Sequence, residues 1–493
     1  MRVNRKLYAL LNCIHPEGLK KPIWPVIFLL VQACSSNPEM PKIVVPPVVG
    51  NGLSFITTAD RSSLLAPGEN LDFTASTDGS NQLVVDSTLT YQTIDGFGYT
   101  MTGGSAMLLH TKLTAPDRQK LLQETFGTDA GGMGFSYLRI SIGASDLDDR
   151  VFSYDDLSAG QTDESLSGFS LDPDRKHLIP VLKEILQINP SVRIMGSPWS
   201  APAWMKSNGL PKGGSLKSVY YQAYANYFVK YIKGMEAEGI NIDAVTLQNE
   251  PENPGNTPSM TMTSAEQALF VKSHLGPAFR SAGIKTKIIV FDHNCDHPIY
   301  PIEVLTDPAA NEFIDGSAFH LYAGDISAMG TVHEVFPSKH VYFTEQWTSG
   351  QGDFGGDLRW HLKNVVIGAT RNWGRTVLEW NFANDENFNP HTTDGGCTLC
   401  QGALTINNST GMVTRNVSYY IIAHASRFVP PGSVRIGSNM VAGFPNVAFK
   451  TPAGKKVLIV LNDSDKNGDF TIRFGNRQAT AFLRAGSVGT YIW

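Results

Sequence analysis

The segment 192–248 contains the pattern that decides the fold: VRIMGS at 192–197, an amphipathic stretch over Ser218–Glu238, and AVTLQ at 244–248. The two outer runs are short and apolar, which is typical of buried strands, and the central stretch has the length and apolar spacing of a helix. Strands joined through a helix normally lie parallel in one sheet. The segment therefore predicts a parallel strand–helix–strand unit.

The same alternation extends in both directions along the chain. Eight strands with helices between them, in roughly 290 residues, suit a closed barrel. We therefore predict an α/β fold, a (β/α)8 TIM barrel over residues 91–428. The predicted strands are Tyr91–Phe97, Tyr137–Ile142, Val192–Ser197, Ala244–Gln248, Ile288–Phe291, Gly316–His320, His340–Phe343 and Arg375–Trp380. The predicted helices are Ala115–Thr125, Asp174–Ile188, Ser218–Glu238, Ser264–Ala282, Ala309–Phe313, Leu358–Asn372 and Val417–Phe428.

The two ends of the chain have a different pattern. After Pro430 come short strand-like runs separated by turns such as Pro452-Ala453-Gly454. Residues 53–90 also read as strands. We predict a β-sandwich side domain built from both ends, residues 53–90 and 429–493.

The N-terminus reads as an export signal. Basic residues precede a short apolar run, Ile23–Val31, which is too short to span a bilayer. Small Ala33 then precedes Cys34, as in bacterial lipoprotein signals. We expect a signal peptide over 1–33, a lipid on Cys34, a Pro- and Val-rich tether over 34–52, and an exported protein anchored to a bacterial membrane, at the cell surface or in the periplasm. The alternative is ordinary secretion with an incidental cysteine.

Composition narrows the function classes. The 493 residues carry 40 basic and 45 acidic side chains, a net charge of −5, which argues against a nucleic-acid partner. Cys397 and Cys400 could close a small disulfide loop. A metal site at these cysteines would need two more ligands, and the nearest cluster, 292–297, is remote in sequence. We expect neither metal nor cofactor, and the oligomeric state stays open.

Active groups of a β/α barrel project from the carboxyl ends of its strands. The predicted strands end in polar and aromatic residues: Asp95, Arg139–Asp146, Pro198-Trp199, Asn249-Glu250-Pro251, Asp292–Asn294, His320–Tyr322, Glu345 and Trp380-Asn381. Glu250 and Glu345 follow the fourth and seventh strands, so they could face each other across the barrel mouth. Two carboxyl groups about 5–5.5 Å apart suit retaining glycoside hydrolysis. The alternative for each glutamate alone is a salt bridge at the rim.

The motifs taken together resemble glycoside hydrolase family 30, the family of lysosomal glucosylceramidase. The resemblance covers nearly everything after the tether. The motifs that carry it are TIDGFG at 93–98, LRIS at 138–141, GSPWSAPAWMK at 196–206, NEP at 249–251, HLY at 320–322, TE at 344–345 and WN at 380–381.

The resemblance implies a role for each glutamate. Glu250 would be the acid/base and Glu345 the nucleophile. In that mechanism Glu250 begins protonated, so we expect a neighbouring carboxylate or burial to raise its pKa.

The resemblance also implies supporting residues. Asn249 would donate to the sugar 2-hydroxyl, and Arg139 would help to keep Glu345 ionised. The other implied substrate-binding residues are Asp146, Trp199, His320, Tyr322 and Trp380. The alternatives are barrel packing for the tryptophans, a structural ion pair for Arg139 and a core histidine for His320.

Similarity to one branch of the family narrows the choice of substrate. The segments 92–100 and 395–400 resemble the β-1,6-glucanase branch, which implies an endo-β-1,6-glucanase acting on pustulan-type glucan. An exo-acting β-glucosidase or a glucosylceramidase is the alternative within the family. A surface glycan-binding protein is the alternative outside enzymes, and a metal hydrolase using the Asp292–His297 cluster is a third hypothesis.

Overall fold

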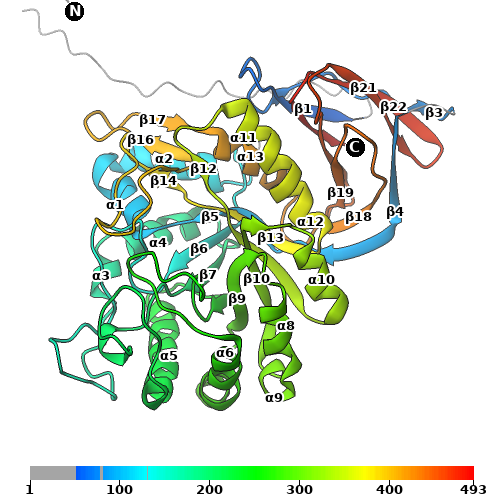
Figure 1. Ribbon diagram of the computed structural model, residues 1–493. Helices are drawn as coiled ribbons and strands as arrows, with labels where there is room; N and C mark the ends of the chain where they lie inside the picture. Colours follow the sequence, from blue (N-terminus) through cyan, green and yellow to red (C-terminus); the bar gives the residue numbers. More distant parts are fainter. Residues whose placement is uncertain (1–51, 78–80, 130) are drawn as a thin grey trace, which may run out of the picture. The chain divides into compact units, whose positions relative to one another are not determined.

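The computed structural model describes residues 52–77, 81–129 and 131–493 (Figure 1). The predicted signal peptide, the lipidation site Cys34 and the tether up to residue 51 lie outside the described residues. Among the residues described, no helix has the length and apolar character needed to cross a membrane.

The predicted TIM barrel is confirmed. Eight parallel strands close in the order β10–β11–β13–β5–β6–β7–β8–β9. Seven of them contribute one residue each to a buried interior cluster of Tyr137, Met195, Ala244, Ile289, Ala318, Tyr342 and Leu378. The barrel strands are β5 (Gly96–Thr100), β6 (Tyr137–Ser141), β7 (Arg193–Ser197), β8 (Ala244–Thr246), β9 (Lys287–Cys295), β10 (Ile314–Gly324), β11 (His340–Glu345) and β13 (Gly374–Glu379).

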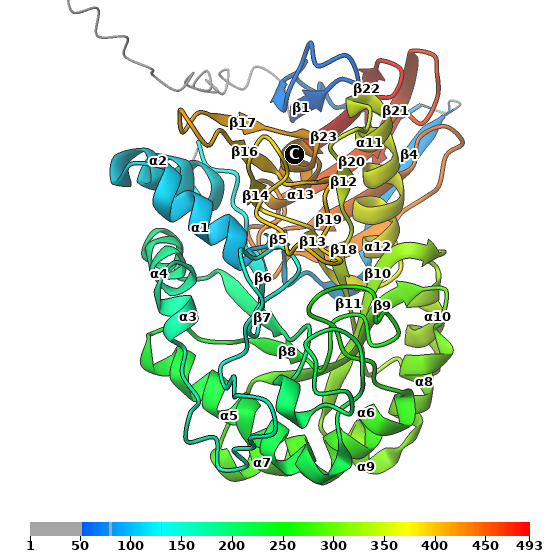
Figure 2. The same ribbon diagram turned by 60° about the vertical axis from the view of Figure 1, so that its left-hand side comes forward.

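Helices cover the outside of the barrel (Figure 2). Two of them begin where the sequence places a cap: the Thr114 hydroxyl accepts from the Asp117 N–H, and Thr263 forms a capping box with Glu266. The helices are α1 (Gly103–Lys112), α2 (Ala115–Phe126), α3 (Asp172–Arg175), α4 (Leu178–Ile188), α5 (Tyr221–Ala237), α6 (Ser264–Phe270), α7 (Gly276–Ala282), α8 (Ile299–Thr306), α9 (Pro308–Asn311), α10 (Ala328–Val335), α11 (Phe354–His361), α12 (Gly368–Arg371) and α13 (Val417–Ser426). Single π-helical segments, Val271–Leu275 and Leu362–Ile367, join α6 to α7 and α11 to α12.

The predicted side domain is also confirmed, and both chain ends build it. Its ten strands follow the order β2–β1–β23–β20–β19–β18–β4–β21–β22–β3. Leu53 in β1 pairs with Ile492 in β23, so the first and last described strands are neighbours. The strands are β1 (Leu53–Thr57), β2 (Ala66–Pro67), β3 (Thr74–Ala75), β4 (Gln82–Thr93), β18 (Val434–Ser438), β19 (Asn446–Lys450), β20 (Lys456–Leu461), β21 (Gly468–Phe474), β22 (Arg477–Leu483) and β23 (Val488–Ile492).

Short strands border the barrel mouth. β12 (Thr348–Ser349) pairs with β15 (Cys400–Gln401), which ties the segment after Glu345 to the cysteine loop. β14 (Ala383–Asn384), β16 (Leu404–Ile406) and β17 (Val413–Arg415) form a three-stranded sheet.

The prediction of one strand over Tyr91–Phe97 is wrong. β4 of the sandwich runs to Thr93, and the barrel strand β5 begins only at Gly96. Gly98 in β5 explains the glycine-rich sequence here, because a Cβ at this position would lie 1.9 Å from the Tyr137 carbonyl oxygen of the neighbouring strand. The turn between β4 and β5 therefore transfers the chain from sandwich to barrel.

Because β5 begins at Gly96, Asp95 does not lie at the carboxyl ends of the barrel strands, where the sequence analysis placed it. Asp95 precedes β5, so it lies at the opposite end of the barrel. Its carboxylate accepts from Arg375 at 2.8 and 2.9 Å and pairs with Arg193 at 2.6 Å. Both arginines stand near the starts of their strands, so the cluster closes the amino-terminal end of the barrel.

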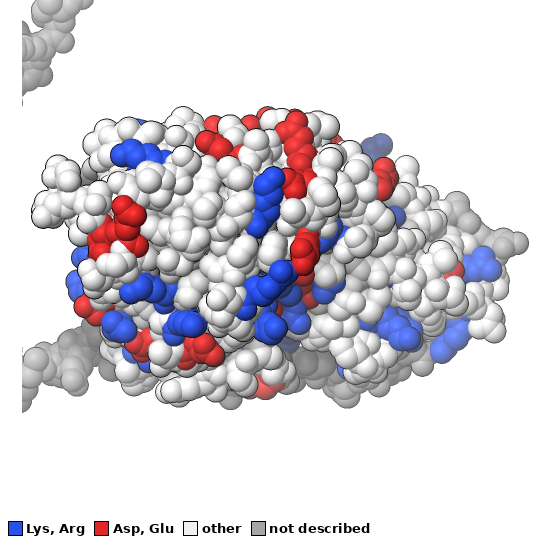
Figure 3. Space-filling view, turned by 90° about the horizontal axis from the view of Figure 1, so that it is seen from below, with Lys and Arg blue, Asp and Glu red and all other residues white. Residues whose placement is uncertain are grey.

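Basic and acidic side chains are both scattered over the face seen from below in Figure 3, and neither sign covers it alone. Ion pairs on the surface include Arg175 with Glu238 and Arg280 with Glu312. This mixture agrees with the small net charge of the sequence.

A buried histidine joins the barrel helix α13 to the sandwich. His424 has its two ring nitrogens 2.8 Å from the hydroxyls of Thr57 in β1 and Thr490 in β23. The Thr490 hydroxyl donates to the His424 carbonyl oxygen, so it accepts from the ring N–H, and the other nitrogen accepts from Thr57. A neutral imidazole therefore satisfies every bond, and burial lowers the pKa of His424 to about 3.

We expect His424 to make the fold acid-sensitive. Because its folded-state pKa lies below the unfolded value, its contribution is complete above about pH 6.5 and is lost as the pH falls toward 3. Between pH 7.5 and pH 5 this removes about 2 kcal/mol from the free energy of unfolding. Denaturant titration at both values should show a smaller pH-dependent loss in His424→Gln than in wild type. Equal losses would contradict the assignment.

Candidate active site

A pocket of about 310 Å³ opens where the barrel strands end. Glu250 follows β8, and Glu345 is the last residue of β11. The pocket is lined by Asp146, Glu250, Asn253, Asn256, Asn294, Tyr322, Glu345, Trp347, Trp380, Cys397 and Cys400. The chain thus brings together, at one mouth, residues that are up to about 250 positions apart in sequence.

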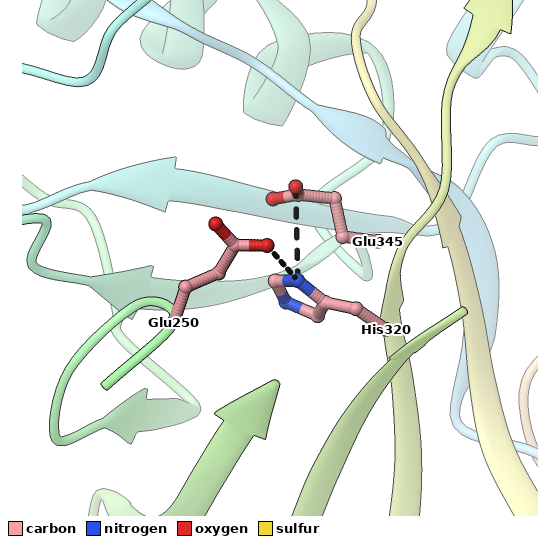
Figure 4. Close-up of side chains that lie close together, drawn as sticks. All are labelled: Glu250, His320 and Glu345. Carbon is pink, nitrogen blue, oxygen red and sulfur yellow. Dashed lines mark hydrogen bonds and ion pairs between the residues drawn. The ribbon is translucent and has the colours of Figure 1, made fainter. Parts of the chain in front are cut away.

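The two predicted carboxyl groups meet in this pocket (Figure 4). One oxygen of each, together with a ring nitrogen of His320, lies within 4.8 Å of the other two atoms. Both glutamates are 6% exposed. This separation lets both carboxyl groups contact a single sugar ring, and it is in the range in which the second carboxylate can attack directly.

Backbone conformation helps to aim Glu250. Its φ of 47° is in the left-handed region, which side-chain-bearing residues rarely adopt. The Glu250 N–H donates to the Asp292 carbonyl oxygen at 2.9 Å, and Asp292 itself has a φ of 64°. Two neighbouring strands therefore turn together at the rim, and residues in such conformations cluster at functional sites.

His320 lies between the carboxyl groups. Its Nδ1 is 3.3 Å from Glu250 Oε1 and 3.7 Å from Glu345 Oε1, while Nε2 is 3.1 Å from Asp292 Oδ1. Burial opposes a charge on this ring, but the three carboxylates, Glu345 foremost, raise the pKa of His320 to about 9. The ring is therefore an imidazolium at neutral pH and donates on both sides.

Arg139 supplies the second buried cation. It is fully buried and donates to Glu345 Oε2 at 2.5 Å, Asp292 Oδ2 at 2.8 Å, Asn249 Oδ1 at 2.6 Å and Ser197 Oγ at 3.1 Å. Because the Asn249 oxygen accepts from Arg139, its amide NH₂ is left to donate elsewhere. Arg139 thus fixes three functional side chains at once.

Asp292 is the residue whose role the sequence analysis missed. Its carboxylate accepts from Arg139, Thr246 and Thr344 and pairs with His320. Although burial opposes ionisation, Arg139 and His320 hold the pKa of Asp292 far below its ordinary value. Its position directly after the predicted strand Ile288–Phe291 was the available signal.

The hypothesis of a metal site over Asp292–His297 fails on geometry. The Asp292 carboxylate points into the barrel, whereas His297 is exposed and bonds to Glu252. Glu250, His320 and Glu345 are the one group of described residues whose spacing could hold an ion. They do not fit one well, because both nitrogens of His320 already face carboxylates and its raised pKa keeps it protonated.

The pKa values of the pair differ from the sequence prediction. Burial of Glu250 is outweighed by the hydrogen bond from His320 and by Asn253, so its pKa is lowered. Burial raises the pKa of Glu345 despite His320 and Arg139. The expectation of a raised pKa for Glu250 is therefore wrong for the ligand-free protein, because it did not include the donors that surround this carboxylate.

The aromatic residues occupy different depths. Trp380 lines the pocket, and Trp199 stacks behind it with ring centroids 5.4 Å apart. The Arg139 guanidinium also lies over the Trp199 ring, 4.7 Å from its centroid. The Tyr322 hydroxyl donates to Glu345 Oε1 at 3.0 Å. Trp347, which the sequence analysis did not single out, also lines the pocket.

The cysteine loop borders the pocket next to Asp146. Cys397 and Cys400 form a disulfide, and both line the pocket. The Cys397 N–H donates to Asp146 Oδ2 at 3.3 Å. Burial, with Glu345 and Glu250 nearby, raises the pKa of Asp146 to about 7.

A closed β/α barrel with a close pair of buried carboxyl groups at the strand ends is the arrangement that a retaining glycosidase requires. Residues 94–429 match the glycosyl hydrolase family 30 TIM-barrel domain, and residues 432–491 match the family 30 beta sandwich domain. The chain therefore belongs to glycosyl hydrolase family 30.

Individual relatives agree with this assignment. The chain is 35% identical to the endo-1,6-beta-D-glucanase neg1 of Aspergillus fumigatus, covering 81% of this chain and 85% of that protein. It is 27% identical to the lysosomal acid glucosylceramidase of Mus musculus, covering 82% and 81%. The solved structure of the endo-beta1,6-glucanase BT3312 superposes with a TM-score of 0.84 at 35% identity, covering 90% of this chain and 99% of that one.

We expect Arg139→Met to destabilise the protein by about 3–5 kcal/mol, because it leaves buried Glu345 and Asp292 with His320 as their one remaining cationic partner among the described residues. Denaturant unfolding at pH 7 measures the loss, which should shrink at lower pH as the two carboxylates take up protons. Arg280→Met is the control: Arg280 pairs with Glu312 at 2.6 Å with both side chains about 60% exposed, and we expect about 0–1 kcal/mol there. Similar losses in both variants would contradict the role of Arg139.

Proposed function

We propose that this chain is a retaining endo-β-1,6-glucanase that cleaves pustulan-type glucan by double displacement. The observation that carries the mechanism is the pair of buried carboxyl groups, with oxygens of Glu250 and Glu345 within 4.8 Å. The proposed linkage is supported by likeness to proteins named endo-1,6-beta-D-glucanases at 34–35% identity.

In the first step Glu345 is the nucleophile. Its oxygen bonds to the anomeric carbon as the bond to the departing oxygen breaks, and Glu250 gives that oxygen a proton. The product is a glycosyl ester on Glu345. In the second step Glu250, now a carboxylate, takes a proton from water, whose oxygen bonds to the anomeric carbon and releases Glu345.

His320 can supply the proton that Glu250 must give to the departing oxygen in the first step. In the ligand-free enzyme the charge of Glu345 is the largest influence that raises the pKa of His320. Glu345 loses that charge as it bonds to carbon, so the imidazolium becomes a stronger acid. Its proton can then pass across the 3.3 Å contact to Glu250. Release of Glu345 restores the charge and returns the proton to His320.

The remaining side chains would hold the sugar in place. The free NH₂ of Asn249 is positioned to donate to the 2-hydroxyl, a bond that strengthens as the ring becomes cationic. Asp146 would accept from sugar hydroxyls, and Trp380 would form one wall of the pocket with Trp199 stacked behind it. Tyr322 and Arg139 orient Glu345 through its two oxygens.

A glucosylceramidase, or an exo-acting β-glucosidase, is the second candidate. The observation in its favour is the similarity to the mouse lysosomal acid glucosylceramidase over 82% of this chain. A glycan-binding protein without activity would have the same fold, but it would not need the charge network around Glu250 and Glu345.

We also propose that the protein is exported and carries a lipid on Cys34 that anchors it to a bacterial membrane. The support is the sequence alone, in which basic residues, the apolar run Ile23–Val31 and Ala33 precede this cysteine. Such an anchor would hold the enzyme outside the cytoplasm, where it can contact polysaccharide from the surroundings of the cell.

A product profile tests the function. Wild type should convert β-1,6-glucan to a series of oligosaccharides and leave β-1,3- and β-1,4-glucans intact. Glu345→Ala should lose turnover by several orders of magnitude, and added azide should yield a glycosyl azide of inverted configuration. Release of single glucose units, or hydrolysis of glucosylceramide in preference to glucan, would favour the second candidate. Binding without turnover would favour the glycan-binding protein.

Glu250→Ala tests the acid. We expect roughly 10²–10⁴-fold loss on β-1,6-glucan, whose leaving group needs a proton, and a much smaller loss on a dinitrophenyl glycoside, whose leaving group does not. The comparison of kcat/KM for the two substrates measures the effect. The same loss on both would count against Glu250 as the acid.

Cys34→Ser tests the anchor. The variant should move from the membrane to the soluble fraction when cells are fractionated, because one residue carries the lipid. Wild-type partitioning of the variant would end this proposal.

A further inference from the structure

The two oxygens of the Glu250 carboxyl group have different surroundings. Oε1 faces His320 Nδ1 at 3.3 Å. Oε2 accepts from Asn253 Nδ2 at 2.7 Å and from Asn256 Nδ2 at 3.4 Å. Of these three contacts to the carboxyl group, the one from the neutral amide of Asn253 is the shortest.

The Asn253 side chain is held in one orientation. Its Oδ1 accepts from the Gly255 N–H at 2.9 Å, so the NH₂ group is the end that faces Glu250. Its backbone N–H donates to the Glu250 carbonyl oxygen at 2.9 Å, which closes a turn. Pro251 and Pro254 restrict the backbone on either side.

The chemistry of the amide distinguishes the two oxygens. An NH₂ group donates and cannot accept. A proton on Oε2 would point toward these N–H donors or weaken their bonds. Oε1 also faces a donor, the Nδ1–H of His320, but this ring nitrogen becomes an acceptor once its proton has passed to Oε1, whereas the Asn253 amide cannot accept. The favoured protonated form of Glu250 therefore carries its proton on Oε1.

We propose that Asn253 is a positioning residue that keeps Oε2 of Glu250 unprotonated and so makes Oε1 the oxygen that exchanges protons with the substrate. This inference rests on the proposed function. In the first step the O–H bond at Oε1 breaks and the departing oxygen gains that proton, while the glycosidic C–O bond breaks and Glu345 bonds to carbon. In the second step a water proton is transferred to Oε1.

Other groups around Glu250 titrate, whereas Asn253 does not. His320 on β10 and His293 on β9 face Glu250 Oε1, at 3.3 and 4.0 Å. Glu345 on β11 and Asp146 in the loop after β6 are the neighbouring carboxyl groups. Removing the Asn253 donor should therefore move an existing limb of the pH profile without adding a new one.

The test compares substrates that need the acid with one that does not. In Asn253→Ser the hydroxyl can still accept from the Gly255 N–H but is too short to replace the amide at Oε2. We expect kcat/KM on a β-1,6-linked glucose tetramer to fall roughly tenfold, the effect of losing one hydrogen bond to a charged group. The value for dinitrophenyl β-gentiobioside should fall less than about twofold. The alkaline limb should move to higher pH, because the carboxylate has lost a donor.

Asn208→Ala is the matched control. Asn208 caps a comparable turn, with its Oδ1 accepting from the Leu210 N–H at 3.1 Å and its Nδ2 donating to the Lys212 carbonyl at 2.8 Å. We expect the ratio of the two kcat/KM values to stay at the wild-type level there. Thermal unfolding shows that each variant is folded, and Asn253→Ala repeats the measurement if the serine variant is not.

Two results would overturn the inference. One is an equal loss on both substrates in a folded Asn253 variant, which would make Asn253 a purely structural residue. The other is a folded Asn253 variant whose ratio of the two kcat/KM values equals that of wild type and whose pH profile has an unchanged alkaline limb. Failure of the proposed function itself would appear separately, as a Glu250→Ala variant that shows no dependence on the leaving group.

Discussion

Two buried cations hold the site together. The Arg139 guanidinium and the His320 imidazolium lie among the carboxyl groups of Glu250, Asp292 and Glu345, all of them almost excluded from solvent. Charges buried in this way are tolerated only when they are paired and hydrogen-bonded. The positions of these side chains are therefore interdependent, and a change to one charge alters the protonation of the others.

The barrel is what makes such an arrangement possible. Arg139, Asp292, His320 and Glu345 come from four different strands, and Glu250 follows a fifth. Each reaches the same mouth because parallel strands end at the same side. The rim also accepts left-handed backbone at Glu250 and Asp292, which turns side chains inward from β8 and β9. The opposite end, by contrast, is closed by the structural ion pairs of Asp95 with Arg193 and Arg375.

Much of this could be predicted from the sequence, and the errors have physical causes. The alternation of short apolar runs and helices predicted the barrel, and the position of Glu250 and Glu345 after strands brought them together correctly. The predicted boundary between sandwich and barrel near Ile94 was wrong because β4 and β5 follow each other almost without interruption. The roles of Asp292 and Asn253 were not predicted, because these roles depend on side-chain contacts that sequence spacing does not reveal. The pKa direction of Glu250 failed for the same reason.

The sheet order of the sandwich has a consequence for how the polypeptide matures. β1 is bonded to β23, and β4 lies between β18 and β21, so each of these early strands has partners among the last 60 residues. A ribosome makes the early strands more than 340 residues before those partners exist. Both edges of β4 and the edge of β1 that faces β23 have no native partner through almost the whole of translation, and the side domain can be completed only after synthesis of the final strand.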